Sequence, residues 1–243
     1  MRLDLALVGA GLARSRSHAR QLIDAGRVEV PGLDRVKPAT LVDPACDLSV
    51  RVDPYVSRAA HKLVAALDQA RIDIRGRALD AGASTGGFTQ VLLERGAEQV
   101  YAIDVGHGQI AETIRRDPRV VTTEGLNLRD LSLADVGSAP VDLAVADVSF
   151  ISLRLVLEPI LSVVDHHGFA LVLVKPQFEV GRAQLDSHGV VTSDRARQAA
   201  VAQVVDHATG LGWALQWSAD SVLPGQDGNR EVFCLFRRHS ADQ

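Results

Sequence analysis

The chain has 243 residues, of which 47% are hydrophobic and 23% charged, and a formal net charge of −4 at pH 7. This length gives room for one large domain, or for a medium domain with a small second one. The hydrophobic content excludes a disordered chain. Two cysteines, Cys46 and Cys234, form neither a disulfide framework nor a zinc pattern, so no metal is expected.

No apolar run reaches the roughly 18 residues that a membrane helix needs. Residues 1–5 include an early acid and lead into no long apolar region, which excludes a secretory signal. We therefore expect a cytoplasmic protein that does not contact a membrane, and no feature indicates an obligate protein partner. Charge is unevenly spread, because residues 1–62 hold 10 Lys and Arg against 7 Asp and Glu. A basic N-terminal part favours contact with nucleic-acid phosphate.

The pattern of residues 1–50 predicts a small α+β domain. A short apolar segment at residues 3–8 precedes a helix over residues 13–23, with Ser15 as its N-cap. A strand over residues 27–30 then ends in a Pro-Gly turn. The apolar stripe of the helix leaves its arginines on another face.

This N-terminal part resembles the S4 RNA-binding domain, in which a helix and the following hairpin present basic side chains to structured RNA. Pro31 departs from the pattern, since such domains often carry Asn before the glycine. The alternative is a surface helix with solvated arginines. The residues that the resemblance implies for RNA contact are Arg2, Arg14, Ser15, Arg16, Arg20, Gln21 and Lys37.

Residues 51–57 are predicted to be a linker, and Ser57 to cap a helix over residues 58–67. Strands and helices alternate through the second domain, residues 58–243, which is typical of a parallel sheet covered on both faces. Strands are expected at 77–80, 99–104, 119–122, 142–147 and 169–175, and helices at 88–94, 108–116, 153–164 and 194–209. Two last strands, at 213–218 and 232–237, lack a helix between them and look like the antiparallel finish of a class I (Rossmann-like) methyltransferase sheet.

A glycine-rich turn follows the first of these strands, in the segment Leu-Asp-Ala-Gly-Ala-Ser-Thr-Gly-Gly-Phe at residues 79–88. Such a turn lets the backbone approach a ligand closely and precedes a helix N-terminus. Its spacing differs from the dinucleotide fingerprint G-x-G-x-x-G. It resembles motif I of the S-adenosylmethionine-dependent methyltransferases, and the alternative is an ordinary tight turn. The residues implied for the cofactor are Asp80, Gly82, Ala83, Ser84, Thr85, Gly86, Gly87 and Phe88.

Further candidates stand where other strands end, because ligands of open α/β sheets bind at the carboxyl ends of strands. Asp104 ends the second strand and can accept hydrogen bonds from both ribose hydroxyls of an adenosine. Asn127 is placed near the adenine. Asp147 ends the fourth strand in Asp-Val-Ser-Phe, without the two prolines of base N-methyltransferases, which makes amine methylation less favoured.

Lysine usage marks two further positions. The chain has 23 Arg and only 3 Lys, namely Lys37, Lys62 and Lys175. Arginine stays charged, whereas a buried lysine can lose its proton and act as a base. Lys175 follows four apolar strand residues and is expected in a partly desolvated site, although drift in composition leaves the same pattern.

The order of Lys62, Asp147, Lys175 and Glu231 is similar to the Lys-Asp-Lys-Glu tetrad of ribose 2′-O-methyltransferases related to FtsJ. With the S4-like head, nearly the whole chain resembles the TlyA family of ribosomal RNA methyltransferases, also called hemolysin A. Tyr55 and His107 replace a more usual Trp and Tyr. The resemblance implies S-adenosylmethionine as cofactor and cytidine 2′-hydroxyls of 16S and 23S ribosomal RNA, within ribosomal subunits, as substrate.

The tetrad suggests a division of roles for these four residues. Lys175 would act as the base, and Lys62 would favour its neutral form and stabilise the developing alkoxide. Asp147 would hold Lys175 and help to position the methyl donor, while Glu231 would orient Lys62 or the ribose. Three alternatives stay open: a non-catalytic RNA-binding or ribosome-assembly factor, a base methyltransferase, and a hemolysin, which no amphipathic segment supports.

Overall fold

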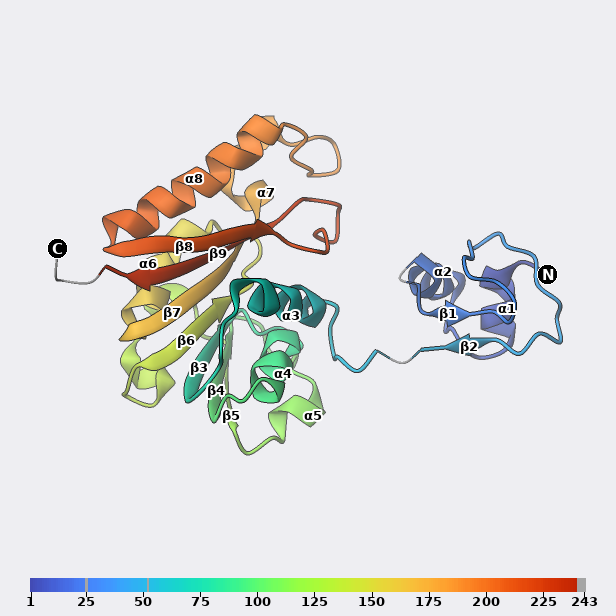
Figure 1. Cartoon of the computed structure of the whole chain (residues 1–243), viewed down its shortest axis with the longest axis horizontal. Helices are drawn as coiled ribbons and strands as arrows, with labels where there is room; N and C mark the ends of the chain where they lie inside the picture. The colour runs from blue at the N-terminus through green and yellow to red at the C-terminus, as the bar shows by residue number, and fades with distance from the viewer. Residues whose placement is uncertain (25, 52, 240–243) are drawn as a thin grey trace. The chain divides into compact units, whose positions relative to one another are not determined.

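The structure is a computed structural model that describes residues 1–24, 26–51 and 53–239. The chain forms two units, Met1–Pro54 and Tyr55–Gln243, shown in Figure 1. Their division falls inside the predicted linker, whose residue 52 lies outside the described residues, as do residues 240–243 of the predicted second domain. No helix in the described part of the chain is long and apolar enough to cross a membrane.

The N-terminal unit has the predicted mixture of helix and strand. It contains α1 (Leu3–Gly9), α2 (Arg16–Asp24), and the antiparallel pair β1 (Val28–Glu29) and β2 (Ser49–Val50). The Ser15 hydroxyl accepts a hydrogen bond from the backbone N–H of His18 at 3.2 Å, which confirms it as the cap of α2. The helix begins at Arg16, directly after this cap, as the choice of Ser15 predicts.

The turn at Pro31 and Gly32 is also present. The N–H of Leu33 donates to the carbonyl of Val30 at 3.0 Å, and Gly32 has a φ of 79°. Proline suits the second position of such a turn because its φ is fixed, and glycine suits the third because φ is positive there. The departure at Pro31 is therefore compatible with the turn.

A buried carboxylate organises the basic side chains of this unit. Asp4 is fully buried on α1 and lies beside Arg2 at 3.0 Å, Arg16 at 3.3 Å and Arg20 at 3.7 Å. The hydrogen bond from Arg2, together with that from Arg16, lowers the pKa of the Asp4 carboxyl to about 2. Three of the arginines expected to contact RNA thus surround one acid.

The second unit is a seven-stranded sheet with helices on both faces (Figure 1). Its strands are β3 (Arg77–Ala81), β4 (Gln99–Asp104), β5 (Val120–Glu124), β6 (Val141–Ala146), β7 (Val164–Val174), β8 (Trp213–Asp220) and β9 (Val232–Arg238). Its α-helices are α3 (Ala59–Ala70), α4 (Gly87–Glu94), α5 (Glu112–Arg115), α6 (Leu157–Ser162), α7 (Pro176–Glu179) and α8 (Asp194–Gly210). The order is β5-β4-β3-β6-β7-β9-β8, and β9 runs antiparallel to both of its neighbours, as the sequence predicts.

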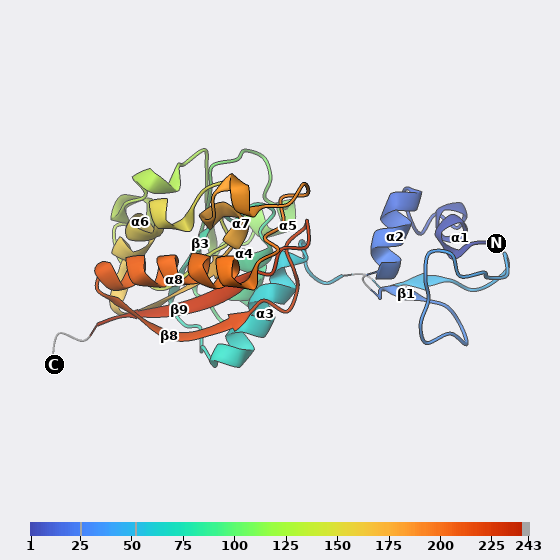
Figure 2. The same cartoon turned by 90° about the horizontal axis from the view of Figure 1, so that it is seen from above.

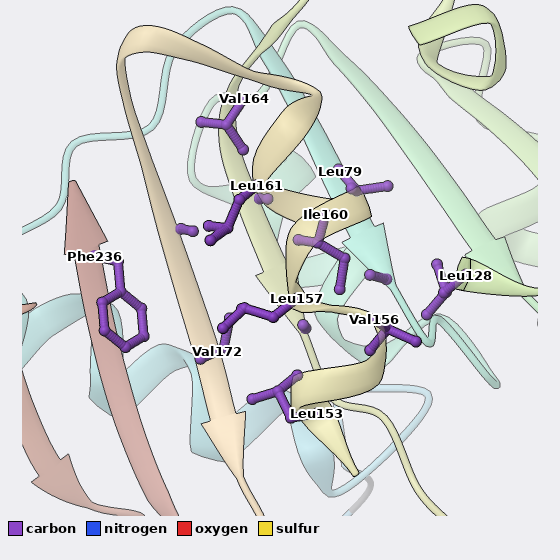
Figure 3. Close-up of a cluster of buried hydrophobic side chains, with 14 of the residues drawn as sticks. Leu79, Leu128, Leu153, Val156, Leu157, Ile160, Leu161, Val164, Val172 and Phe236 are labelled. Atoms are coloured by element: carbon purple, nitrogen blue, oxygen red, sulfur yellow. The ribbon is translucent and has the colours of Figure 1, made fainter. Parts of the chain in front are cut away.

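Alternating strand residues build a core on each side of the sheet. On one face Leu79 and Val172 pack with α6, whose buried Leu157, Ile160 and Leu161 belong to the same cluster and are labelled in Figure 3. On the other face, neighbouring strand residues pack against α3 and α4. Figure 2 shows α8 and α3 on either side of β8 and β9. The doubly covered sheet explains why the strands are apolar on both faces.

The topology brings several chain segments to one edge of this sheet. The parallel strands β3, β4, β6 and β7 all end there, at Ala81, Asp104, Ala146 and Val174. Because β9 is reversed, it begins at the same edge, and Val232 pairs with Val174. The residue before β9 and the residue after β7 are therefore neighbours.

Some predicted boundaries are wrong. The helix predicted over 108–116 shrinks to α5, because residues 105–111 form a loop in which Gly108 has a φ of 64°. The helix predicted over 153–164 divides into a 3-10 turn (Leu153–Leu155) and α6, since the chain enters β7 already at Val164. Positive φ and strand pairing are tertiary features that local periodicity does not carry.

The predicted cap Ser57 is displaced by one residue. Helix α3 begins at Ala59 with Arg58 in the cap position, and Arg58 makes no side-chain cap hydrogen bond. The Ser57 hydroxyl still accepts a hydrogen bond from the N–H of Ala59 at 3.1 Å. It therefore satisfies a helix N–H from just outside the helix.

We predict that Asp4→Asn destabilises the N-terminal unit, because it leaves three neighbouring guanidinium groups without their carboxylate. Since the pKa is lower in the folded state, the stabilisation by Asp4 is present above about pH 4 and is lost as the pH falls toward 2. Urea unfolding of the full chain, followed by amide resonances of residues 1–54 at pH 6 and pH 3, measures both effects. Asp34→Asn, at an exposed position, is the control; equal stability of the two variants at pH 6 would contradict the prediction.

Candidate active site

A cavity of about 150 Å³ opens where the parallel strands end. It is formed by the glycine-rich turn, the start of α3 and the segments that follow β6 and β7. Its lining residues are Ser57, Ala59, Gly82, Ala83, Ser84, Thr85, Gly87, Phe88, Asp147, Ser149 and Lys175. The cavity is smaller than the ~300 Å³ of a typical ligand pocket, so it has room for only part of a cofactor-sized ligand.

The glycine-rich turn requires glycine for reasons that the structure makes explicit. Gly82 has a φ of 87°, and a Cβ there would lie 2.9 Å from the carbonyl oxygen of Asp147. A Cβ on Gly87 would lie 2.8 Å from the Cβ of Ser57. Both distances are shorter than those that Cβ atoms make in real protein structures. The turn therefore packs directly on the segments that carry Asp147 and Ser57, with no room for side chains.

Asp104 holds the glycine-rich turn and the next loop together. Its carboxylate accepts hydrogen bonds from the N–H of Ser84 at 2.8 Å and from the N–H of Gly106 at 2.7 Å. Ser84 adopts a positive φ of 47°, a conformation that the Asp104 hydrogen bond stabilises. Each carboxylate oxygen keeps a second lone pair, so a hydroxyl of a ligand could still donate to it.

Lys175 and Asp147 form the ion pair that lines the cavity. Lys175 Nζ lies 2.6 Å from Asp147 Oδ1, and both side chains are largely buried. The lysine donates its aligned hydrogen bond to Ser149 Oγ, also at 2.6 Å, whereas Asp147 Oδ1 accepts no aligned hydrogen bond. The carboxylate therefore has lone-pair capacity to accept a further hydrogen bond.

Lys62 and Glu231 form a second pair, which is more deeply buried. Lys62 Nζ donates to Glu231 Oε2 at 2.6 Å, with side-chain exposures of 6% and 2%. Gly225 admits this carboxylate, since a Cβ there would lie 2.7 Å from Glu231 Oε1. Removing two charges from water is costly, so such a pair is weak evidence for stability and favours a functional role.

Asp80 lies fully buried beneath the glycine-rich turn. The Thr89 hydroxyl of α4 donates to its Oδ2 at 2.6 Å, while Oδ1 has no hydrogen-bond partner. Burial, and then the negative charges of Asp147 and Asp104, raise the pKa of Asp80 to about 7. Asp80 therefore changes protonation near neutral pH.

Some of the predicted site residues line the cavity, and others do not. Those that line it are Gly82, Ala83, Ser84, Thr85, Gly87, Phe88, Asp147 and Lys175; those that do not are Lys62, Asp80, Gly86, Asp104, Asn127 and Glu231. Asn127 is exposed, and its side chain accepts a hydrogen bond from the N–H of Arg129 at 3.1 Å. Its placement near an adenine stays a prediction.

Two residues of the site were missed in the sequence. Ser149 contacts Lys175 directly, and its only sequence signal is its place two residues after Asp147. Glu179 is buried and accepts hydrogen bonds from Ser152, Leu153 and Arg154. Nothing in the sequence distinguishes this buried glutamate from an ordinary solvent-exposed glutamate near the end of a short helix.

The residues predicted to contact RNA lie on the N-terminal unit. Arg14, Gln21 and Lys37 are exposed. Arg2, Arg16 and Arg20 are held beside Asp4, and the Ser15 hydroxyl caps α2. Their contact with RNA stays a prediction.

Comparison with known proteins identifies the family. An FtsJ-like methyltransferase model matches residues 55–238, and an S4 domain model matches residues 1–45. The 16S/23S rRNA (cytidine-2′-O)-methyltransferase TlyA of Mycobacterium tuberculosis is 49% identical over 97% of this chain and 89% of its own length. The chain belongs to the TlyA family of FtsJ-like methyltransferases.

Other members of the family carry different names. Hemolysin A of Brachyspira hyodysenteriae is 34% identical over 97% of this chain and 99% of its own length. A solved structure from Streptococcus thermophilus, provisionally named a hemolysin, is 33% identical with a TM-score of 0.77, covering 99% of this chain and 89% of that one. The chain is thus a methyltransferase with an S4 domain, as the sequence predicts.

We predict that Asp80→Asn removes a pH dependence of stability. Because burial raises the pKa of Asp80 to about 7, the folded state holds a proton that the unfolded chain releases near pH 4. Wild-type stability should therefore fall by up to about 4 kcal/mol between pH 4 and pH 8 through this group, and the asparagine variant should lack this loss. Denaturant unfolding of both proteins across this range measures the difference, and parallel curves would contradict it.

Proposed function

We propose that the chain transfers a methyl group from S-adenosylmethionine to the 2′-hydroxyl of a cytidine ribose in 16S or 23S ribosomal RNA. The observation that carries this proposal is the pair of buried lysine–carboxylate contacts at the edge of the sheet where the glycine-rich turn lies. The similarity to TlyA of Mycobacterium tuberculosis, whose name states this reaction, supports the choice of substrate. A ribosomal substrate also implies a cytoplasmic protein.

The site has features that suit S-adenosylmethionine. Five residues of the glycine-rich turn line the cavity, namely Gly82, Ala83, Ser84, Thr85 and Gly87, and none of them has a long side chain that would fill it. Helix α4 begins at Gly87 with no side-chain cap, and its first two residues, Gly87 and Phe88, line the cavity, so N–H groups of this helix end are available at the site. Asp147 lines the cavity beside Lys175, and a carboxylate at that place suits a positively charged ligand.

We assign binding roles on this basis. The turn from Gly82 to Phe88 would hold the amino-acid end of the cofactor, and Asp104 would accept hydrogen bonds from its ribose hydroxyls. S-adenosylmethionine supplies a methyl group that a positively charged sulfur already activates. The protein must therefore align the ribose hydroxyl with that group and remove the hydroxyl proton.

Lys175 is the residue that we assign as the base. S-adenosylmethionine would supply the methyl group to the ribose oxygen, and Lys175 Nζ would accept the proton that the hydroxyl loses. Asp147, 2.6 Å from this nitrogen, then neutralises the resulting ammonium. Lys62 would stabilise the negative charge that develops on the ribose oxygen, with Glu231 fixing its position.

We predict that Lys175→Ala lowers the single-turnover rate of methyl transfer by at least roughly 100-fold, since a general base contributes that much or more. Lys175→Arg should fail equally, because a guanidinium keeps the charge but does not lose its proton. Calorimetry with S-adenosylhomocysteine should give nearly unchanged affinity for both variants. Either variant transferring methyl at the wild-type rate would remove Lys175 as the base.

Nucleoside analysis of the methylated RNA tests the reaction itself. The expected product is 2′-O-methylcytidine in ribosomal RNA after incubation with labelled cofactor and ribosomal subunits. A methylated base would instead indicate a base methyltransferase. A wild-type chain that binds subunits without transferring a methyl group would indicate a non-catalytic assembly factor.

For the N-terminal unit, we predict that Arg14→Gln and Lys37→Gln weaken binding to ribosomal RNA and reduce its salt dependence. Both side chains are exposed, and removing one cation from a phosphate should lower the slope of log affinity against log salt by about one. Filter binding at several salt concentrations measures the slope. The control is Arg75→Gln, two residues before β3 and so at the opposite edge of the sheet; unchanged slopes in the first two variants would argue against RNA contact there.

A further inference from the structure

The amine of Lys175 has two close neighbours, which differ in geometry. Ser149 Oγ lies 2.6 Å from Nζ and accepts an aligned hydrogen bond. Asp147 Oδ1 is equally close, but it is out of line for a hydrogen bond. The Asp147 carboxylate therefore contributes negative charge beside the Lys175 amine, and the Ser149 hydroxyl orients that amine.

Direction matters for a lysine that acts as a base, and this step rests on the function proposed above. A neutral primary amine has two N–H bonds and one lone pair in tetrahedral directions, so fixing an N–H restricts where the lone pair points. We propose that Ser149 is a positioning residue that orients the Lys175 amine toward the ribose 2′-hydroxyl. The hydroxyl proton moves to Lys175 Nζ, and Ser149 neither gains nor loses a proton.

The segment that carries Ser149 is joined to the segment that carries Lys175. Glu179, four residues after Lys175, has a side chain only 1% exposed and accepts hydrogen bonds from the segment that follows Ser149. Its partners are Ser152 Oγ at 2.6 Å, the N–H of Leu153 at 2.6 Å and Arg154 Nε at 3.2 Å. The carboxylate therefore fixes the segment after β6 to the segment after β7.

A second contact between the same segments lies beside the first. The rings of Phe150 and Phe178 are 5.5 Å apart, and Phe150 has a positive φ of 65°. Phenylalanine rarely adopts this conformation, and Phe150 is 92% exposed, so the contact with Phe178 is the interaction that accompanies it. Both contacts join the segment directly after Ser149 to the segment after Lys175, and such support is what accurate placement of a reacting group requires.

The alternative is that Ser149 is an ordinary surface serine with no role in catalysis, and two observations argue against this alternative. The Ser149 hydroxyl accepts a hydrogen bond from a lysine whose side chain is only 11% exposed, and both residues line the cavity. A solvated serine also has no need of a neighbouring segment that a buried glutamate holds in place. The arrangement therefore fits a serine that positions Lys175.

The test compares Ser149→Ala with Ser149→Thr in the full chain, using single-turnover methyl transfer to ribosomal subunits. The alanine variant should lower kcat by roughly 10- to 100-fold, since small misplacement of a reacting group costs up to about 100-fold. The KM for the cofactor and the thermal midpoint should not change, because the side chain is exposed. The threonine variant restores the hydroxyl and should recover most of the rate.

Ser162→Ala is the matched control, since this exposed serine ends α6 at the opposite end of β7. A wild-type rate in Ser149→Ala would overturn the positioning role and leave the proposed function intact. A threonine variant as slow as the alanine variant would also overturn it, because the hydroxyl would then not matter. A wild-type chain that transfers no methyl group would instead refute the proposed function, and this inference with it.

Discussion

Two ammonium–carboxylate pairs, held with little water at one edge of a parallel sheet, are the constraint on which this site depends. Lys175 pairs with Asp147 at the ends of neighbouring strands β7 and β6. Lys62 comes from α3 and reaches Glu231 at the start of β9. Burying charges is costly unless they are paired, and each lysine has its own acid. The site can therefore hold both lysines close to a ligand and largely out of bulk water.

The reversed strand β9 makes this arrangement possible. In an entirely parallel sheet, the residue before a strand lies at the edge opposite to the site. Because β9 runs antiparallel to β7, Glu231 precedes it at the edge where Lys175 follows β7. A catalytic role for a residue at the start of a strand thus depends on the direction of that strand.

A similar arrangement occurs in the N-terminal unit, where a buried acid again organises cations. Asp4 gathers Arg2, Arg16 and Arg20 and is shielded from solvent by its surroundings. The arginines lose some freedom in these ion pairs, so binding a phosphate would cost them less entropy. The carboxylate also lowers the net charge of the group, which tempers non-specific attraction to RNA.

Much of this protein follows from local sequence. The glycine-rich turn after β3, the apolar strands and the antiparallel finish are visible because each depends on short-range spacing or periodicity. Lys175 and Asp147 were candidates for a similar reason, since each directly follows an apolar strand. Lys62 and Glu231 were identified through a family resemblance, because a lysine in a helix and a glutamate before a strand have no distinctive local pattern.

The tertiary structure alone decided which residues meet. Lys62 and Glu231 are 169 residues apart in the chain, and their contact depends on how α3 packs on the sheet and on the direction of β9. The hydrogen bond from Lys175 to Ser149 and the burial of Glu179 are likewise set by contacts between segments. The 105–111 loop and the early start of β7 were missed because positive φ values and strand pairing overrode the helical pattern. Local spacing fixes where a side chain stands on its own element, whereas its partner, its burial and its charge state arise only when the elements pack together.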